Sequence, residues 1–330
     1  HKFLFSKLKD KQTFKIYNNF ENHLKLDEDF VVAVSGGPDS LALSFLAKIY
    51  ALKKSLNVKY IIVDHKLRKN SLNEVILVKN LLKKISVKLT ILKWLGKKPK
   101  TNIQSIARLN RYKLLINELK RIKIKNILLG HHQRDYYENF FIRILRGSGL
   151  NGLVSLDKKS KYQNINLYRP LLEFEKKDLI YISKKIFRNY VDDPFNKKED
   201  FKRVKIRNLL KNLETEGFDL NKFNLTIKNL KSANESIKSS TEKNIYNNST
   251  YLIKKNSFIL NGEFLNNAEE VVFRSFVKLI QIIGGRYYPV RGKKIDKLLE
   301  LARNKSKFKT TLGNCIIKKV NETIIITKEH

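Results

Sequence analysis

Apolar runs alternate with segments of helical periodicity through the first two-thirds of the 330-residue chain. Short runs rich in β-branched residues are typical of strands buried on both faces, and they occur at Phe30–Val34, Val58–Asp64, Val87–Trp94 and Asn126–Gly130. Apolar positions three and four residues apart predict helices, at Ser40–Leu52, Leu72–Lys83, Asn102–Lys120 and Tyr136–Arg146. This alternation predicts an α/β fold with a parallel sheet and right-handed crossovers.

The pattern changes in the last third of the chain. Helical periodicity runs from about Asp178 through the basic stretch Lys202–Leu210, and the polar segment Leu213–Gly217 predicts a domain boundary. Beyond it the pattern predicts a long helix, a polar linker, a pair of strands, two helices and further strands, at Asn221–Lys238, Ser239–Ser249, Tyr251–Ile253 with Phe258–Leu260, Ala268–Ile283, Arg291–Arg303 and Lys309–Thr327. We therefore expect a first domain at 1–215, helical from about 178, and a smaller α+β domain at 216–330.

Positive charge dominates the composition, because 68 Lys and Arg residues face 31 Asp and Glu residues, giving a net charge of +37. Such an excess favours polyanions through phosphate contacts and counterion release. Nucleic acid is the leading partner, and an anionic membrane surface is the alternative. No apolar run approaches the roughly 20 residues of a membrane span, and the N-terminal segment lacks the apolar core of a signal peptide. We expect a cytoplasmic protein without a membrane partner.

The most informative segment is Ser35–Ser40, which reads Ser-Gly-Gly-Pro-Asp-Ser and follows a predicted strand directly. Two adjacent glycines allow backbone conformations closed to other residues and let a ligand approach the N–H groups closely. The helix behind them adds the positive end of its dipole, and the two serines add hydroxyl donors. The segment lacks the Gly-Lys-Ser/Thr of the common triphosphate loop. It predicts an anion cradle, although a bare glycine turn is more often structural.

Two further polar clusters, Asp64-His65 and His131-His132, also follow predicted strands directly. Ligands of parallel sheets bind beyond the carboxyl ends of the strands. Asp135 and Glu138 are three residues apart at a helix start, where two carboxylates beside a phosphate cradle suit Mg²⁺. They could equally complement the helix dipole. Asp39 is a third candidate carboxylate, whose alternative role is to cap the helix that follows it.

Five segments follow, in order and at matching spacing, the motifs of one group of nucleotide-binding proteins. Ser35–Ser40 matches the Ser-Gly-Gly-x-Asp-Ser loop of the PP-loop ATP pyrophosphatases. The others are Asp64–Ser71, Asn102–Tyr112, Gly130–Glu138 with Leu145–Leu150, and Arg169–Leu172 with Asp193–Asn196, Arg203 and Arg207. Through this combination, across roughly residues 28–210, the chain resembles the tRNA(Ile)-lysidine synthases.

The resemblance implies a Rossmann-like PP-loop domain, then a helical segment and a smaller α+β domain that binds tRNA. It implies a ligase that uses ATP to adenylate O2 of cytidine 34 in the CAU anticodon of tRNA(Ile). Free L-lysine then attacks C2, and the products are lysidine, AMP and pyrophosphate. The implied cofactors are ATP and Mg²⁺, and the implied partners are tRNA(Ile) and L-lysine. The oligomeric state, with a homodimer among the possibilities, stays open.

The resemblance also assigns roles to individual residues. Those expected to bind ATP are Ser35, Gly36, Gly37, Pro38, Asp39, Ser40, Asp64, His65, Arg108, Arg111 and His131. Those expected to act in catalysis and to hold Mg²⁺ are Asp39, Asp135 and Glu138, of which the last two could instead bind the substrate lysine. Those expected to form a basic ledge for tRNA are Arg143, Arg146, Arg203, Lys205 and Arg207, joined by the C-terminal segments Arg286–Tyr288 and Arg291–Lys294.

Three positions depart from the family's pattern. Arg134 stands where the family usually has aspartate, Tyr136 where it has glutamine, and Phe195 where it has serine. A cation beside a metal site weakens Mg²⁺ or lysine binding unless the side chain turns outward. These departures leave the ligand set open.

Other readings of the same residues remain. A non-catalytic tRNA-binding protein could keep the loop and carry Arg134 and Tyr136 as relics. The tRNA thiolases of the PP-loop group generally use paired cysteines, and this chain has only Cys315. GMP and NAD synthetases share the loop but give no reason for a charge of +37.

Overall fold

The computed structural model describes residues 2–66, 71–96, 103–191, 202–285 and 290–329. The expectations for 67–70, 97–102, 193–196 and 286–288, including Phe195, lie outside the described residues. The chain divides into two compact units, His1–Phe218 and Asp219–His330. Each unit is described by itself.

The first unit is built around a six-stranded sheet with the order β3-β2-β1-β4-β6-β5. All neighbouring strands pair in parallel except β5 with β6, which pair antiparallel. The strands are β1 (Phe30–Val34), β2 (Val58–Asp64), β3 (Leu89–Lys93), β4 (Asn126–Leu128), β5 (Lys159–Tyr162) and β6 (Ile165–Tyr168). The predicted α/β fold is therefore confirmed, whereas the β5–β6 hairpin was not predicted.

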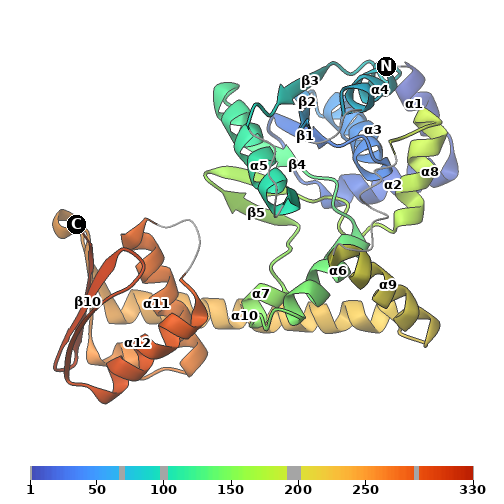
Figure 1. Ribbon diagram of the computed structural model, residues 1–330. Coiled ribbons are helices and arrows are strands. Elements are labelled where there is room, and N and C mark those ends of the chain that lie inside the picture. The colour runs from blue at the N-terminus through green and yellow to red at the C-terminus, as the bar shows by residue number, and fades with distance from the viewer. Residues whose placement is uncertain (1, 67–70, 97–102, 192–201, 286–289, 330) are drawn as a thin grey trace. The chain divides into compact units, whose positions relative to one another are not determined.

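Helices cover both faces of this sheet (Figure 1). The helices of the first unit are α1 (Lys2–Lys7), α2 (Lys11–His23), α3 (Pro38–Lys53), α4 (Ser71–Lys83), α5 (Ile103–Arg121), α6 (Gln133–Ile144), α7 (Leu150–Leu153), α8 (Lys176–Phe187) and α9 (Lys202–Thr215). Alternate residues of a strand point to opposite faces, so Phe30, Val32 and Val34 join the core beneath α3 and α8. Val31 points the other way, into a core closed by α5. Burial on both faces explains why β1 reads as one continuous apolar run.

The order of the strands places β1 at the centre of the sheet. From β1 the chain moves to β2 and β3 on one side and then to β4 and β6 on the other. In open parallel sheets such a reversal is where ligands bind, beyond the carboxyl ends of the strands. The segment Ser35–Ser40 lies at this reversal, between the end of β1 and the start of α3.

The second unit packs two helices on one face of an antiparallel sheet with the order β7-β8-β11-β10-β9. Its elements are α10 (Leu220–Asn248), β7 (Ser249–Leu252), β8 (Ser257–Leu260), α11 (Glu269–Gly284), α12 (Gly292–Asn304), β9 (Lys307–Thr311), β10 (Cys315–Val320) and β11 (Thr323–Lys328), with the short 3₁₀ helices η2 (Ile253–Lys255) and η3 (Gly262–Leu265). Cys315 is buried in its core. No helix of the described residues is long and apolar enough to cross a lipid bilayer.

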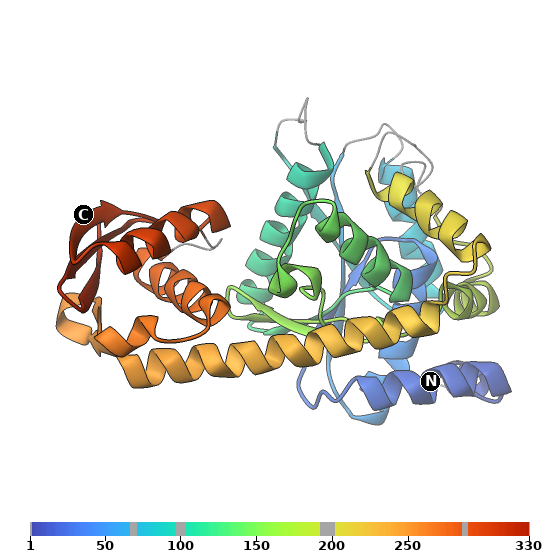
Figure 2. The ribbon, with the colours of Figure 1, turned by 90° about the horizontal axis from the view of Figure 1, so that it is seen from below.

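The predicted linker at residues 239–249 is wrong. Figure 2 shows α10 as one continuous helix, which ends only at Asn248. The polar side chains of this segment misled the prediction because one of them, Asn244, is buried and satisfied by tertiary contacts. The Asn244 amide donates to the carbonyl of Phe264 at 3.2 Å and to Ser275 Oγ at 3.2 Å.

Candidate nucleotide-binding site

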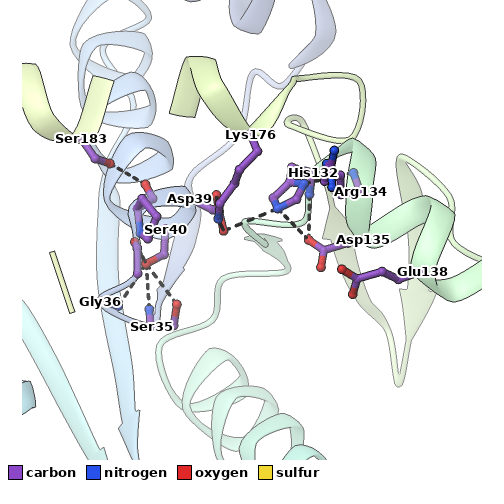
Figure 3. Close-up of polar contacts among 12 residues, drawn as sticks. Ser35, Gly36, Asp39, Ser40, His132, Arg134, Asp135, Glu138, Lys176 and Ser183 are labelled. Carbon is purple, nitrogen blue, oxygen red and sulfur yellow. Dashed lines mark hydrogen bonds and ion pairs between the residues drawn. The ribbon is translucent and has the colours of Figure 1, made fainter. Parts of the chain in front are cut away.

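The hydroxyl of Ser40 closes the loop between β1 and α3 (Figure 3). Its Oγ accepts hydrogen bonds from the backbone N–H of Ser35 at 3.1 Å and of Gly36 at 3.0 Å. It donates to the carbonyl of Gly37 at 3.0 Å. Ser40 is 3% exposed, so this hydroxyl shapes the loop from inside. Its direct contact with a nucleotide stays a prediction.

The three glycines of the site differ in whether the fold requires a glycine at their position. Gly36 has φ +88°, and a Cβ there would lie 2.5 Å from Val78 Cγ2, so both conformation and space require glycine. A Cβ on Gly37 would meet only Ser35 Oγ, at 4.0 Å, so the fold itself does not require glycine there. A Cβ on Gly130 would lie 3.3 Å from the backbone nitrogen of Ser40. Gly130 therefore lets the end of β4 approach the first turn of α3.

The first turn of α3 has no side-chain cap at its N-terminus. Gly37 is the N-cap residue and supplies no side-chain hydrogen bond to the helix. The first N–H groups of a helix have no intrahelical acceptor, and together with the helix dipole they attract phosphate. This geometry agrees with the predicted cradle.

Asp39, in that first turn, is held by a lysine from α8. Lys176 Nζ lies 2.6 Å from both Asp39 Oδ1 and Asp39 Oδ2. The side chains are 34% and 22% exposed, so the pair borders solvent. About two turns further along α8, Ser183 Oγ donates to the carbonyl of Pro38 at 2.6 Å. Helix α8 therefore fixes two consecutive residues of the loop.

His132 lies between Asp39 and the start of α6. Its Nδ1 accepts from the N–H of Arg134 at 3.1 Å, which places the ring proton of the neutral imidazole on Nε2. That Nε2 is 3.8 Å from Asp39 Oδ2 and 3.8 Å from Asp135 Oδ2. The His132 N–H in turn donates to Asp135 Oδ2 at 3.0 Å, which completes a capping box. The two carboxylates thus converge on one imidazole.

Burial and neighbouring charges set the protonation of two groups beside this imidazole. Burial acts to raise the pKa of Asp135, but the facing His132 and its N–H outweigh burial, so the pKa lies below its usual value. Burial lowers the pKa of His131 to about 3, and Arg169, Arg108 and Arg111 add to this effect against the opposing Asp135. At neutral pH the site therefore contains an ionised Asp135 and an uncharged His131.

Glu138 lies on the next turn of α6 and faces α9. It is 1% exposed, and its Oε1 accepts from Arg207 Nε at 2.8 Å. Its Oε2 is buried without a hydrogen-bond partner among the described residues. Within the described parts of the chain, no three carboxylate, histidine or cysteine side chains form a metal-binding group. The structure therefore brings Asp39 and Asp135 together and places Glu138 with Arg207.

Three further arginines, Arg108, Arg111 and Arg169, lie close enough to influence one another's charge, and Arg169 has Asp157 as an acidic neighbour. Arg108 donates to Tyr112 Oη at 3.4 Å, and its guanidinium lies 5.2 Å from the centre of that ring. Burial lowers the pKa of Arg111, and the nearby Arg108 and Arg203 lower it further. Arg169, only 6% exposed, donates to the carbonyl of Asp157 and to Ser160 Oγ. Such a group of guanidiniums suits an anionic ligand.

The Asp64-His65 cluster lies at the end of β2. Asp64 is 3% exposed, and its Oδ1 accepts from the N–H of Lys66 at 2.9 Å. The His65 ring lies edge-on to Trp94, with ring centroids 6.5 Å apart. Burial lowers the pKa of His65, and Arg111 adds to the effect. Nucleotide contact by these residues stays a prediction.

Comparison with known proteins gives the family. A family model described as PP-loop domain matches residues 8–214. A tRNA(Ile)-lysidine synthase of Wolbachia pipientis wMel is 32% identical over 307 residues, which cover 90% of this chain and 70% of that protein. One from Rickettsia akari (strain Hartford) is 30% identical over 318 residues, covering 94% and 72%. The chain belongs to the tRNA(Ile)-lysidine synthase family.

A solved structure of lower identity shares the fold. The U34-tRNA thiolase NcsA from Methanococcus maripaludis, with its 4Fe–4S cluster, matches with a TM-score of 0.54 and 17% identity, covering 63% of this chain and 75% of that chain. At this identity the likeness concerns the fold alone.

The departures of this family member at Arg134 and Tyr136 have a structural account. Arg134 turns to α9, where its terminal nitrogen lies 3.1 Å and 2.9 Å from the two carboxylate oxygens of Glu214. Tyr136 is 7% exposed and packs in the interior. The cation therefore pairs with α9 instead of facing Asp135. With the Glu138–Arg207 pair, two ion pairs join α6 to α9. Helix α6 supplies the cation in one pair and the anion in the other.

The two ion pairs also define the direction of α9 relative to α6. Position 134 pairs with 214 and position 138 with 207, so the helices are antiparallel. The C-terminal end of α6, with Arg143 and Arg146, therefore lies toward the N-terminal end of α9, with Arg203 and Lys205. Of these four, Arg143 is half-buried and the others are exposed. Arg207 points its Nε at Glu138, and binding of tRNA by these basic residues stays a prediction.

Sequence reasoning missed Lys176, Glu214 and the burial of Arg169. Lys176 lies in the charged stretch Glu175–Asp178, which reads as a solvated helix start. The only signal was its position shortly after the motif Arg169–Leu172. Its partner Asp39 is 137 residues away in sequence, so only the topology brings the two together.

Alanine substitutions at Gly36 and at Gly37 should have different effects. Gly36→Ala should lower the free energy of unfolding by about 1–3 kcal/mol, because alanine is strained at positive φ and meets Val78. Gly37→Ala should change it by less than about 0.5 kcal/mol, yet weaken ATP binding about tenfold or more by blocking close approach to the loop. Urea unfolding and calorimetric titration with ATP measure the two effects. Equal loss of stability in both variants would contradict the distinction.

The α6–α9 contact gives a second prediction. Arg134→Glu and Glu214→Arg should each destabilise the protein, and the double variant should recover stability because the exchanged charges pair again. We expect a coupling of about 0.5–1 kcal/mol for a partly exposed pair, measured by urea unfolding of all four proteins. A coupling below about 0.3 kcal/mol would mean that the pair does not fix the helices.

Proposed function

We propose that this chain ligates L-lysine to C2 of cytidine 34 in the CAU anticodon of tRNA(Ile), at the expense of ATP. Membership of the tRNA(Ile)-lysidine synthase family gives the reaction class, a ligase that modifies tRNA and uses ATP. The observation that carries the proposal to these residues is the loop closed by Ser40, whose uncapped helix start lies beside Asp39, Asp135 and neutral His131.

The reaction divides into two group transfers. In the first, O2 of the base attacks the α-phosphorus of ATP, the bond to the bridging oxygen breaks, and pyrophosphate leaves with the electron pair. In the second, the ε-amine of lysine attacks C2, AMP leaves with the former O2, and the amine loses its proton. Such steps need positioning and charge stabilisation more than strong acid–base groups. The backbone at Gly37 and the first turn of α3 would hold the phosphates.

Mg²⁺ would bind to Asp39 and Asp135 in this proposal. Mg²⁺ takes one or two carboxylates together with phosphate oxygens and water, and these two carboxylates converge on His132 Nε2. The ion would neutralise charge on the phosphates. Glu138 is not placed with this pair, because its side chain faces Arg207 of α9.

Glu138 would instead receive the substrate lysine. A buried carboxylate oxygen without a partner carries a desolvation penalty, and Glu138 Oε2 is such an atom. An ammonium group donates up to three hydrogen bonds and would satisfy it. This assignment separates the metal pair, Asp39 and Asp135, from the amino-acid acceptor.

The tRNA would lie on the basic ledge of α6 and α9 and on the second unit. Arg143, Arg146, Arg203 and Lys205 offer charge to the phosphate backbone, and Arg207 would join them with its terminal amino groups. The residues 1–215 would then form the catalytic domain and 216–330 the tRNA-binding domain. Arg291–Lys294, at the start of α12, would contribute from the second domain.

Incubation of the purified chain with ATP, L-lysine and unmodified tRNA(Ile) tests the proposed function. We expect one labelled lysine, one AMP and one pyrophosphate per tRNA modified, and no incorporation into methionine tRNA as the matched control. Tight tRNA binding without AMP release would favour a non-catalytic binder. A requirement for a sulfur donor would favour thiolation.

A further inference from the structure

Lys176 places a positive charge at the edge of a phosphate loop that has no lysine of its own. The loop reads Ser-Gly-Gly-Pro-Asp-Ser, whereas the common triphosphate loop carries a lysine that reaches the β- and γ-phosphates. Lys176 Nζ lies 2.6 Å from both oxygens of Asp39, the second residue of α3. Its charge therefore stands next to the helix start that would bind the phosphates.

The ammonium group has capacity beyond Asp39. Lysine has three N–H donors, and the two contacts with Asp39 use two of them. The side chain is 34% exposed, so the group is reachable from solvent. The neighbouring Lys177 differs, because its side chain is 75% exposed and pairs with Glu175 on the same helix.

The position of Lys176 is fixed by the packing of α8. Leu179 and Ile182 are fully buried in the core shared with α3. Ser183 Oγ binds the carbonyl of Pro38, and on the outer side Tyr181 Oη donates to Asp10 of the segment before α2 at 2.7 Å. Helix α8 thus presents Lys176 to the loop from a rigid support (Figure 3).

We infer that Lys176 is the phosphate-binding lysine of this site and contacts the pyrophosphate part of the nucleotide. The inference rests on the proposed function, since pyrophosphate is the leaving group of its first step. When the bond between the α-phosphorus and the bridging oxygen breaks, the electron pair stays on pyrophosphate. Lys176 keeps its protons, donates the third N–H to a pyrophosphate oxygen and stabilises the charge that develops there. The packing of α8 keeps it aligned.

Binding of the two products separates this role from a general effect on the loop. Titration calorimetry of the full chain with inorganic pyrophosphate, without metal, should show about 10- to 100-fold weaker binding for Lys176→Ala, as for loss of a charge-assisted hydrogen bond. AMP binding should change less than about threefold, because AMP lacks the phosphates that Lys176 contacts. Lys177→Ala is the matched control and should bind both products normally. Equal weakening of both products in Lys176→Ala would assign Lys176 a merely structural role and overturn the inference.

A second pair of variants avoids leaving the Asp39 carboxylate without its cationic partner. In Asp39→Asn, Lys176 has no carboxylate to neutralise, and pyrophosphate should bind at least as tightly as to the unaltered protein. Adding Lys176→Ala to Asp39→Asn should then weaken pyrophosphate binding by about tenfold or more. Equal pyrophosphate affinity of the single and the double variant would overturn the inference.

The two hypotheses fail in different ways. A protein that binds pyrophosphate through Lys176 but forms no lysidine would contradict the proposed function alone. A protein that forms lysidine while Lys176→Ala keeps its pyrophosphate affinity would contradict the role of Lys176 alone.

Discussion

The hydroxyl of Ser40 ties the end of β1 to the start of α3, and the geometry of the candidate site follows from this closure. Because Ser40 Oγ occupies the N–H groups of Ser35 and Gly36, these amides are directed into the loop. The free first-turn amides of α3 then remain as the anion-binding end of the helix. Gly130 allows β4 to lie against the same turn. A single hydroxyl therefore decides which backbone groups a ligand can reach.

The charges around this loop fall into two classes. Acidic side chains of the site are held by cations or donors of the chain itself, as in Asp39 with Lys176 and Glu138 with Arg207. The guanidiniums of Arg111 and Arg169 are desolvated by burial, which lowers their pKa values, and the nearby cation of Arg108 lowers them further. A phosphate bound beside them would offset this penalty. The distribution of charges thus points to phosphate at this end of the sheet.

Much of the fold could be predicted from the sequence, because local patterns determine many of its strands and helices. Strands β1 and β2 have the predicted bounds because both are buried on both faces, and α3 follows at once behind the glycines. The hairpin β5–β6 escaped prediction because its edge strand, Lys159–Tyr162, is mostly polar. Helix α10 was cut short because its buried Asn244 gains partners that only the tertiary structure provides.

The site was readable in its motifs but less so in its pairings. His132, from one of the carboxyl-end clusters, lies next to Asp39 of the loop. Lys176–Asp39 and Arg134–Glu214 join residues that are 137 and 80 positions apart, and no spacing rule could reveal them. The outward turn of Arg134 also answers the question that its sequence position raised. A charge that breaks a motif can be neutralised by a neighbouring helix.

The central claim is that the loop closed by Ser40 grips the phosphates of an adenine nucleotide, and a crystal structure with a non-hydrolysable ATP analogue tests it most directly. The account predicts density for the β- and γ-phosphates against Gly37 and the first-turn amides of α3. Phosphate density at any other place on the chain, or none at saturating analogue, would contradict it.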